Sequence, residues 1–151
     1  MLRKVIKYLR WLALAPIRLV HLSRDVEKLN FAIGMMLVDE QMREVEARVP
    51  TGSLDLNRFE RRVFSQGGED GVIQLLTRLL PIRHRTFVEF GVQDYRESNT
   101  RFLTSSGDWK GLIIEGDPAA IKAINEDPIV QRNPLAVAHE FLTAENIDGL
   151  V

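Results

Sequence analysis

The stretch TFVEFGVQDYRESNT, residues 86–100, decides the fold. Its first five residues are β-branched or aromatic apart from Glu89, which is typical of a strand. Gly91 follows directly, and the polar residues after it can begin a helix. Ligands of open α/β sheets bind outside the carboxyl ends of the strands, so this turn is the first candidate site. Gly91 has two explanations: close approach of a ligand to the backbone, or a tight strand-to-helix turn.

Further strands and helices are predicted on both sides of this stretch. A helix is expected over residues 70–80, ended by Pro81. The remaining expected elements are strands at 112–114 and 135–138 and helices near 100–103 and 119–125. Strands alternating with helices at this spacing predict an α/β fold with a parallel sheet.

The segment KGLIIEGDP, residues 110–118, places an acid at the carboxyl end of the second strand. That acid is Glu115, and the two vicinal hydroxyls of a ribose can both donate to one carboxylate. Glu115 is therefore predicted to contact a nucleoside. Asp117 is better explained as the N-cap of a helix that begins at Pro118.

The sequence around Gly91 argues against a dinucleotide. A Rossmann phosphate turn has the pattern Gly-x-Gly-x-x-Gly, which lets a pyrophosphate contact helix amides. Here only the first glycine is present, and Asp94 would repel a pyrophosphate. A cofactor that contains ribose and lacks phosphate fits better, which predicts S-adenosylmethionine.

Three motifs in order resemble a known family. They are FSQGGEDGVIQLL (64–76), FVEFGVQDYRESNT (87–100) and GDWKGLIIEGDP (107–118). Together they look like the N-terminal portion of class I S-adenosylmethionine-dependent methyltransferases of the FkbM-like kind. The resemblance implies a partial Rossmann-like sheet and methyl transfer to an oxygen or nitrogen nucleophile on a small molecule or glycan, a sugar being one candidate.

The same resemblance implies roles for single residues. Glu89 and Gly91 correspond to the acid and the first glycine of the cofactor loop, and Glu115 corresponds to the ribose-binding acid. The chain departs from the family at Gln93 and Tyr95, where many methyltransferases have glycines. No catalytic base is identified.

The segment GGEDG, residues 67–71, lacks the Lys and Ser or Thr of a phosphate loop. Ser65 or a neighbour is expected to cap the following helix. Glu69 and Asp70 are expected to lie near its N-terminus and to complement the positive end of the helix dipole. Gln66 is predicted to reach the cofactor pocket. The three histidines are scattered, and no metal site is predicted.

The N-terminal residues differ from the rest of the chain in charge. Residues 1–24 contain six basic residues and no acidic one, whereas the whole chain has a net charge of -1, which gives no basis for nucleic-acid binding. Apolar residues recur there at helical spacing and predict a basic amphipathic helix. This helix is expected either to lie on an anionic membrane surface, with Trp11 at the interface, or to dock on its own domain.

A second helix is predicted from residue 24 to residue 48. It carries two apolar series with alternating spacings of three and four, which are Phe31, Met35, Val38, Met42, Val45 and Val49, and Leu22, Val26, Leu29, Ile33 and Met36. This spacing predicts either a helix partner, and thus a helix-mediated oligomer, or packing on the neighbouring domain. Residues 1–49 form the predicted arm, 50–63 a linker with a turn cluster at 50–53, and 64–151 the methyltransferase-like domain.

Three strands are predicted where a doubly wound fold has about six, so the domain is expected to be truncated. No apolar run is long enough to span a bilayer and no cleaved signal is evident, which predicts a cytoplasmic protein, peripheral to the membrane if the arm binds lipid. The alternative to a methyltransferase is a non-catalytic, membrane-peripheral or helix-pairing protein that retains part of the fold.

The basic arm generates a first test. Deletion of residues 1–24 is expected to abolish co-sedimentation of the protein with anionic vesicles, and added salt is expected to weaken it by screening. Neutral vesicles are the control. Failure of the intact chain to bind anionic vesicles at low salt would contradict the lipid hypothesis.

Overall fold

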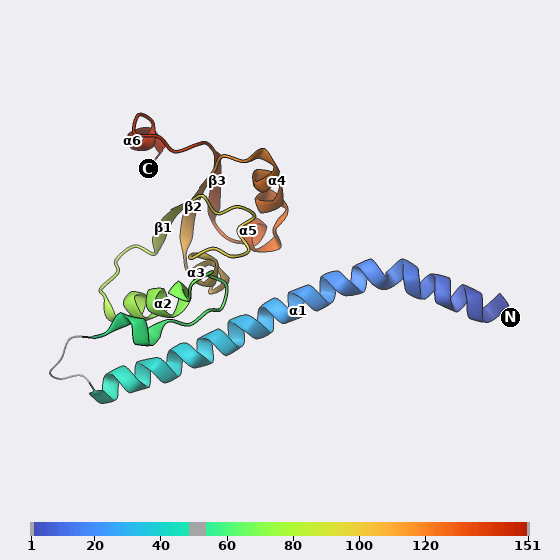
Figure 1. Cartoon of the computed structure of the whole chain (residues 1–151), viewed down its shortest axis with the longest axis horizontal. Helices are drawn as coiled ribbons and strands as arrows, with labels where there is room; N and C mark the ends of the chain where they lie inside the picture. The colour runs from blue at the N-terminus through green and yellow to red at the C-terminus, as the bar shows by residue number, and fades with distance from the viewer. Residues whose placement is uncertain (1, 49–53, 151) are drawn as a thin grey trace.

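The protein consists of a long N-terminal helix and a small α/β unit that packs against the C-terminal half of that helix (Figure 1). The computed structural model describes residues 2–48 and 54–150, with side chains at positions 4, 14–45 and 54–149. The elements are α1 (Leu2–Arg48), the 3₁₀ helix η1 (Leu56–Phe59), α2 (Glu69–Leu79), β1 (Thr86–Phe90), α3 (Arg101–Ser105), β2 (Lys110–Glu115), α4 (Pro118–Glu126), α5 (Pro128–Arg132), β3 (Leu135–His139) and α6 (Ile147–Leu150).

The three strands form a parallel sheet in the order β1-β2-β3. The parallel α/β prediction is confirmed, and each strand falls where the sequence places it. Helix α5 was not predicted, although its start has a recognisable signal. Asp127 caps it by accepting from the Ile129 N–H at 2.8 Å, and Pro128 is its first residue.

One face of the sheet is covered by α4, α5 and the loop that follows β1. Its core contains Val92, Tyr95, Ile113, Ile124, Ile129 and Val130. On the opposite face, Val88 and Phe90 of β1 are 43% and 64% exposed. The loop after β1 is therefore held on the covered face, where its Val92 and Tyr95 pack in this core.

Helix α1 is a single helix of 47 residues, so the prediction of two separate helices is wrong. Pro16 lies inside it, where a proline removes one backbone hydrogen bond and bends a helix without having to end it. The helix bends in its blue N-terminal part (Figure 1). Most side chains of the predicted lipid-binding segment, including Trp11, lie outside the described residues, whereas Lys4 and Arg18 are described and exposed. In the described part of the chain, no helix is long and apolar enough to cross a membrane.

The C-terminal half of α1 packs on the α/β unit through the series that begins at Phe31. Val38 packs with Phe64 and Phe102, and Val45 packs with Phe59 and Leu75. Gly34 permits the close approach, because a Cβ there would lie 2.7 Å from a Val63 methyl group. Packing on the neighbouring domain is thus confirmed for this series.

Residues 54–63 are not the linker that the sequence predicts. Phe59 is 7% exposed and lies between α1 and α2. Arg61 donates its N–H to the Gly68 carbonyl at 2.9 Å, and its own carbonyl accepts from Gly71. The packed unit therefore begins before residue 64. The predicted turn cluster at 50–53 lies outside the described residues.

The start of α2 is organised by Asp70, which is fully buried. One oxygen, Oδ2, accepts from the N–H groups of Val63, Phe64 and Ser65 at 2.8, 2.6 and 2.7 Å. The N-cap residue of α2 is Gly68, which offers no side-chain cap, so Ser65 does not occupy the predicted cap position. The Ser65 Oγ nevertheless accepts from the Asp70 N–H in the first turn at 3.2 Å. One carboxylate thus satisfies three backbone donors of the preceding loop.

Asp70 provides a test of this organisation. Asp70→Ala is expected to lower the free energy of unfolding by about 3 kcal/mol or more, because three buried N–H groups each lose an acceptor. Urea denaturation followed by circular dichroism measures the loss. Glu69→Ala changes an exposed acid of the same turn and is expected to cost much less. Equal losses for the two variants would contradict the role given to Asp70.

Candidate functional site

The carboxyl ends of β1 and β2 lie side by side, which brings together the two regions singled out in the sequence. Phe90 is paired with Ile114, and Gly91 donates its N–H to the Ile114 carbonyl at 3.0 Å. Glu115 is the next residue of β2. Gly91 and Glu115 therefore flank the same edge of the sheet, as expected from a parallel arrangement.

The loop after β1 alternates in backbone conformation. Gly91, Gln93 and Tyr95 have φ angles of 68°, 54° and 65°, all in the left-handed region. Gln93 and Tyr95 stand where the resemblance predicts glycines, and both have a conformation that glycine adopts most easily. Such a conformation costs a non-glycine residue about 1–2 kcal/mol and persists only where its surroundings enforce it.

The left-handed conformation of Tyr95 is stabilised by burial and by hydrogen bonds. Its side chain is fully buried, and its hydroxyl lies 3.1 Å from Thr100 Oγ1 and 2.8 Å from Thr104 Oγ1. Burial raises the pKa of the Tyr95 phenol above its ordinary value, so the hydroxyl stays protonated at neutral pH. Its carbonyl accepts from the guanidinium of Arg101 at 3.3 Å. None of these contacts was predicted from the sequence.

The left-handed conformation of Gln93 is stabilised by a hydrogen bond to Glu115. The Gln93 N–H donates to Glu115 Oε2 at 2.8 Å, and Oε1 of the same carboxylate accepts from Gly116 and Asp117 at 2.8 and 3.0 Å. Glu115 is 9% exposed. It therefore ties the loop after β1 to the loop after β2.

These bonds limit what Glu115 can offer a ligand. A carboxylate has about four acceptor positions, and three of them are used by backbone N–H groups. One position remains on Oε2, enough for one ribose hydroxyl. A contact with both ribose hydroxyls requires the Gln93 N–H to move away.

Glu89 occupies the start of α3. Its Oε1 accepts from the Asn99 N–H at 2.8 Å, and its Oε2 accepts from the Thr100 N–H at 3.0 Å and from the Thr100 hydroxyl. The carboxylate thus holds the far end of the loop onto the sheet. This is the observed role of Glu89, and direct contact with a cofactor remains a prediction.

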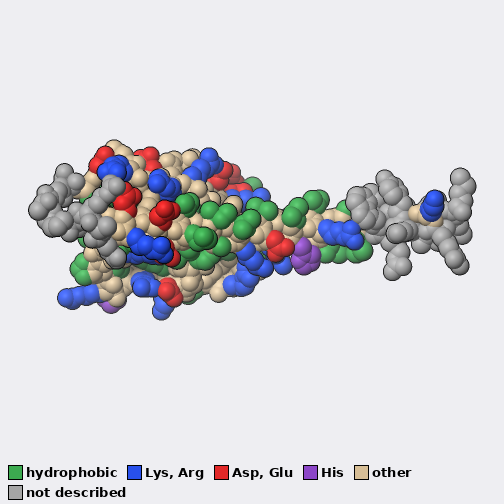
Figure 2. All heavy atoms as spheres, turned by 90° about the horizontal axis from the view of Figure 1, so that it is seen from below, with side chains coloured by type: hydrophobic (Ala, Val, Ile, Leu, Met, Phe, Trp, Pro, Cys, Tyr) green, Lys and Arg blue, Asp and Glu red, His purple; other side chains and the backbone are tan. Residues whose placement is uncertain are grey.

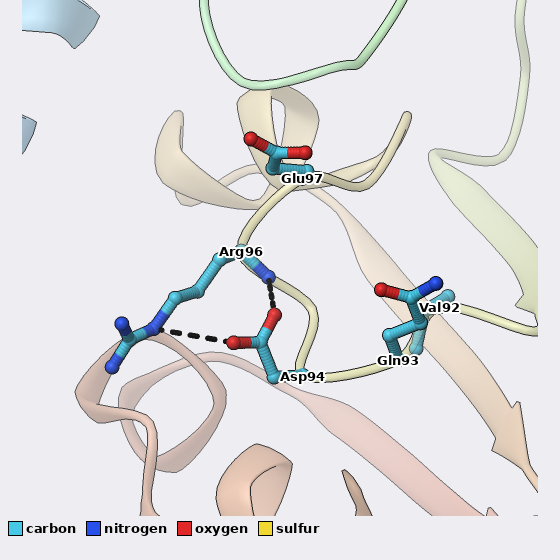
Figure 3. Close-up of a pocket in the computed structure, with 5 residues that line it drawn as sticks. All are labelled: Val92, Gln93, Asp94, Arg96 and Glu97. Atoms are coloured by element: carbon cyan, nitrogen blue, oxygen red, sulfur yellow. Dashed lines mark hydrogen bonds and ion pairs between the residues drawn. The ribbon is translucent and has the colours of Figure 1, made fainter.

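A cavity of about 470 Å³ opens at the loop after β1 (Figure 3). It is lined by Val92, Gln93, Asp94, Arg96 and Glu97. Arg96 pairs with Asp94 at 3.6 Å and also donates its backbone N–H to that carboxylate at 3.1 Å. The volume lies in the range of small-molecule sites.

Phe141 is a candidate site residue that the sequence reasoning missed. It follows β3, is 72% exposed, and lies so close to Gly116 that a Cβ on that glycine would be 2.3 Å from the ring. His139 Nε2 lies 3.1 Å from the Gly116 carbonyl oxygen, which joins the two loops. The rule that selected Gly91 and Glu115, a position at or just beyond the carboxyl end of a strand, would also have selected Phe141.

Two further predictions concern residues near these loops. Asp117 accepts from the N–H groups of Ala119 and Ala120 at 2.6 and 3.4 Å, which confirms it as the N-cap of α4. Gln66 is exposed in the loop before α2. Neither Gln66 nor the other predicted cofactor residues, Glu89, Gly91 and Glu115, line the cavity beside Gln93. Within residues 2–48 and 54–150, no three His, Asp or Glu side chains are grouped to hold a metal ion.

Comparison with known proteins supplies no relative. No protein-family model, curated protein or solved structure matches the chain. The geometry of the loops is therefore the basis for assigning a function.

The loop conformation leads to a paired test. Gly91→Ala is expected to lower the free energy of unfolding by about 1 kcal/mol, because open space surrounds the added Cβ and the cost is in the backbone alone. Gln93→Gly is expected to leave stability unchanged or to raise it by up to about 1 kcal/mol, since it relieves the left-handed conformation. Chemical denaturation measures both. A strongly destabilising Gln93→Gly change would show that the Gln93 side chain, rather than its backbone, is what the loop needs.

Proposed function

We propose that the α/β unit binds S-adenosylmethionine at the carboxyl ends of β1 and β2 and belongs to a methyltransferase. One observation carries the proposal: the Glu89 carboxylate accepts from the N–H groups of Asn99 and Thr100, the two residues that directly precede α3. In a nucleotide-binding fold of the Rossmann kind, those N–H groups contact the pyrophosphate. Here the Glu89 carboxylate takes the place of the pyrophosphate at these N–H groups, so the site favours a cofactor that has no phosphate.

The neighbouring features fit the nucleoside part of such a cofactor. Glu115 has one acceptor position left for a ribose hydroxyl. Gly91 has no atom within 4 Å of the place where a Cβ would be, so a ligand can approach its backbone. The exposed ring of Phe141 offers a surface on which an adenine can stack.

When bound, this cofactor supplies a methyl group on a positively charged sulfur. The contribution of the chain is to hold the cofactor while an oxygen or nitrogen nucleophile, with a sugar or other small molecule as candidate acceptor, is aligned with that methyl group. No described residue is assigned as a catalytic base. Binding and orientation are the roles proposed for Glu115, Gly91 and Phe141.

A non-catalytic function is the alternative, and it is supported by the exposed apolar side chains of α1. In that case the α/β unit would act only as a support for the helix. Cofactor binding separates the two functions, because a mere support has no reason to select one nucleoside.

Isothermal titration of the chain with S-adenosylmethionine tests the proposal. We expect binding that NAD and ATP do not reproduce, since both carry phosphates that Glu89 would repel. Glu115→Ala is expected to weaken binding at least about tenfold, because a hydrogen bond to a charged group contributes roughly 1.5–3 kcal/mol. Asp117→Ala is the matched control, expected to cost about 1 kcal/mol of stability and to leave affinity unchanged.

Because Glu115 also orders both loops, weaker binding by Glu115→Ala could come from a disordered loop rather than from a lost ligand contact, so a second variant is tested. Phe141→Ala removes an exposed ring and is expected to weaken binding while keeping the unfolding midpoint. Absence of S-adenosylmethionine binding by the folded chain, or equal binding of NAD, would contradict the proposal. Loss of binding in Asp117→Ala but not in Glu115→Ala would reverse the roles of the two acids.

A further inference from the structure

Helix α1 carries a second apolar face that no part of the described chain covers. We call it the free seam. Its members are Leu19, Leu22, Val26, Leu29, Ile33 and Met36, which are between 47% and 72% exposed. Solvent exposure of six large apolar side chains in one row is unfavourable, which indicates that a partner covers them.

The free seam lies opposite the face that packs on the α/β unit. Successive residues of an α-helix are about 100° apart, so Leu29 and Phe31, or Met36 and Val38, point in nearly opposite directions. Phe31 and Val38 belong to the packed face. Figure 2, which views the molecule from below, shows a band of hydrophobic side chains along α1 on the side away from the α/β unit. The α/β unit therefore leaves the free seam accessible.

The spacing and residue types of the free seam are those of a coiled coil. The intervals from Leu19 to Met36 are three, four, three, four and three residues. In heptad notation, Leu19, Val26 and Ile33 occupy a positions, while Leu22, Leu29 and Met36 occupy d positions. Val26 and Ile33 are β-branched residues at a, and Leu22 and Leu29 are leucines at d, a combination that favours a parallel two-stranded coiled coil; Leu19 at a and Met36 at d depart from it.

The flanking residues are compatible with a second copy of the same chain. In a parallel pair, a residue at g faces the e residue five positions further on in the other helix. This places Asp25 opposite Asn30 and Arg18 opposite Ser23 of the second copy, so no like charges meet. Within residues 19–36, self-pairing therefore brings no like charges together. Glu40, at the next a position, would face Glu40 of the second copy, so the paired stretch is expected to end at Met36.

The same charges disfavour a membrane as the occupant of this face. Asp25 lies beside the free seam, and Glu40 takes the next a position after Ile33 and Met36. An anionic lipid surface would repel both acids. Four basic residues lie N-terminal to the free seam at positions 3–10 and Arg18 directly precedes it, whereas Arg24 and Lys28 lie within its range, Lys28 paired with Asp25 at 3.6 Å.

The length of the free seam is adequate for a helix pair. Residues 19–36 extend over about 27 Å of helix. In the sequence, the same spacing continues toward the N-terminus at Val5, Tyr8, Leu12 and Ala15, so the pairing spans three to four heptads when it continues past the bend at Pro16.

We propose that two copies of this chain associate in parallel through the free seam, leaving the loop after β1 of each copy open to ligand. The partner is a second copy, because the free seam combines a complete a and d pattern with flanks that carry no net preference for an acidic or a basic surface. The proposal does not depend on the proposed cofactor.

Sedimentation equilibrium of the full chain tests the association. We expect a dimer, and Leu29→Asp is expected to weaken the association at least tenfold by placing a charge in the apolar seam. Val20→Asp is the matched control: Val20 is 52% exposed, similar to Leu29 at 59%, but lies on the opposite side of the helix. Circular dichroism checks that both variants remain helical. A monomeric intact chain, or equal weakening by both substitutions, would overturn the proposal.

The orientation is tested by single cysteines, which the chain lacks entirely. Met36→Cys is expected to form a disulfide-linked dimer under mild oxidation, because equivalent d positions of a parallel pair lie within disulfide distance. Val20→Cys, on the outside of the pair, is expected to cross-link much less. A dimer in which Met36→Cys does not cross-link would be antiparallel and would overturn the parallel arrangement.

Anionic vesicles provide the final discrimination. If Leu29→Asp abolishes vesicle binding by the chain and the chain is monomeric without lipid, the free seam faces a membrane and the proposal is wrong. If Leu29→Asp binds vesicles as the intact chain does and only the dimer is lost, the proposal is supported.

Discussion

The arrangement of α1, the loop after β1 and α5 depends on the contacts made by the guanidinium of Arg101. It is 2% exposed and pairs with Asp127 at 2.6 Å and with Glu27 at 3.2 Å. It also donates to the Tyr95 carbonyl at 3.3 Å and lies over the rings of Phe64 and Tyr95. A single buried cation thus joins α1, the loop after β1 and the start of α5. Its burial is tolerated because two carboxylates and a carbonyl replace the water it loses.

This cluster explains how the loop after β1 sustains two left-handed residues that are not glycine. Tyr95 is held by Arg101 through its carbonyl and by Thr100 and Thr104 through its hydroxyl. Gln93 is held by Glu115. The backbone strain is confined to the loop after β1, whereas the hydrogen bonds and packing that offset it come from three other elements. The shape of the candidate site is therefore a property of the whole unit, including α1.

The sequence predicts the sheet well and the contacts of the site less well, for a physical reason. Strands such as β1 are evident from local runs of branched and aromatic residues, and the parallel order then brings Gly91 and Glu115 together. The partners of Glu89 and the conformation of Tyr95 depend on residues that are brought close only by folding. The continuity of α1 was missed because the basic residues 1–24 and the apolar series of residues 24–48 were treated as separate helices, although no glycine or proline interrupts residues 17–33. The two apolar series of α1 are visible in the sequence, but only the structure shows which of them is covered.

The contact between Glu27 and Arg101 also sets a distance. It fixes one turn of α1 relative to the loop after β1, and the residues that precede this turn rise along the helix by about 1.5 Å each. The N-terminal end of α1 is therefore held roughly 35 Å from the contact, somewhat less because of the bend at Pro16. A helix of this length acts as a spacer, so any surface or molecule bound near its start is kept at a nearly constant separation from the cavity beside Gln93.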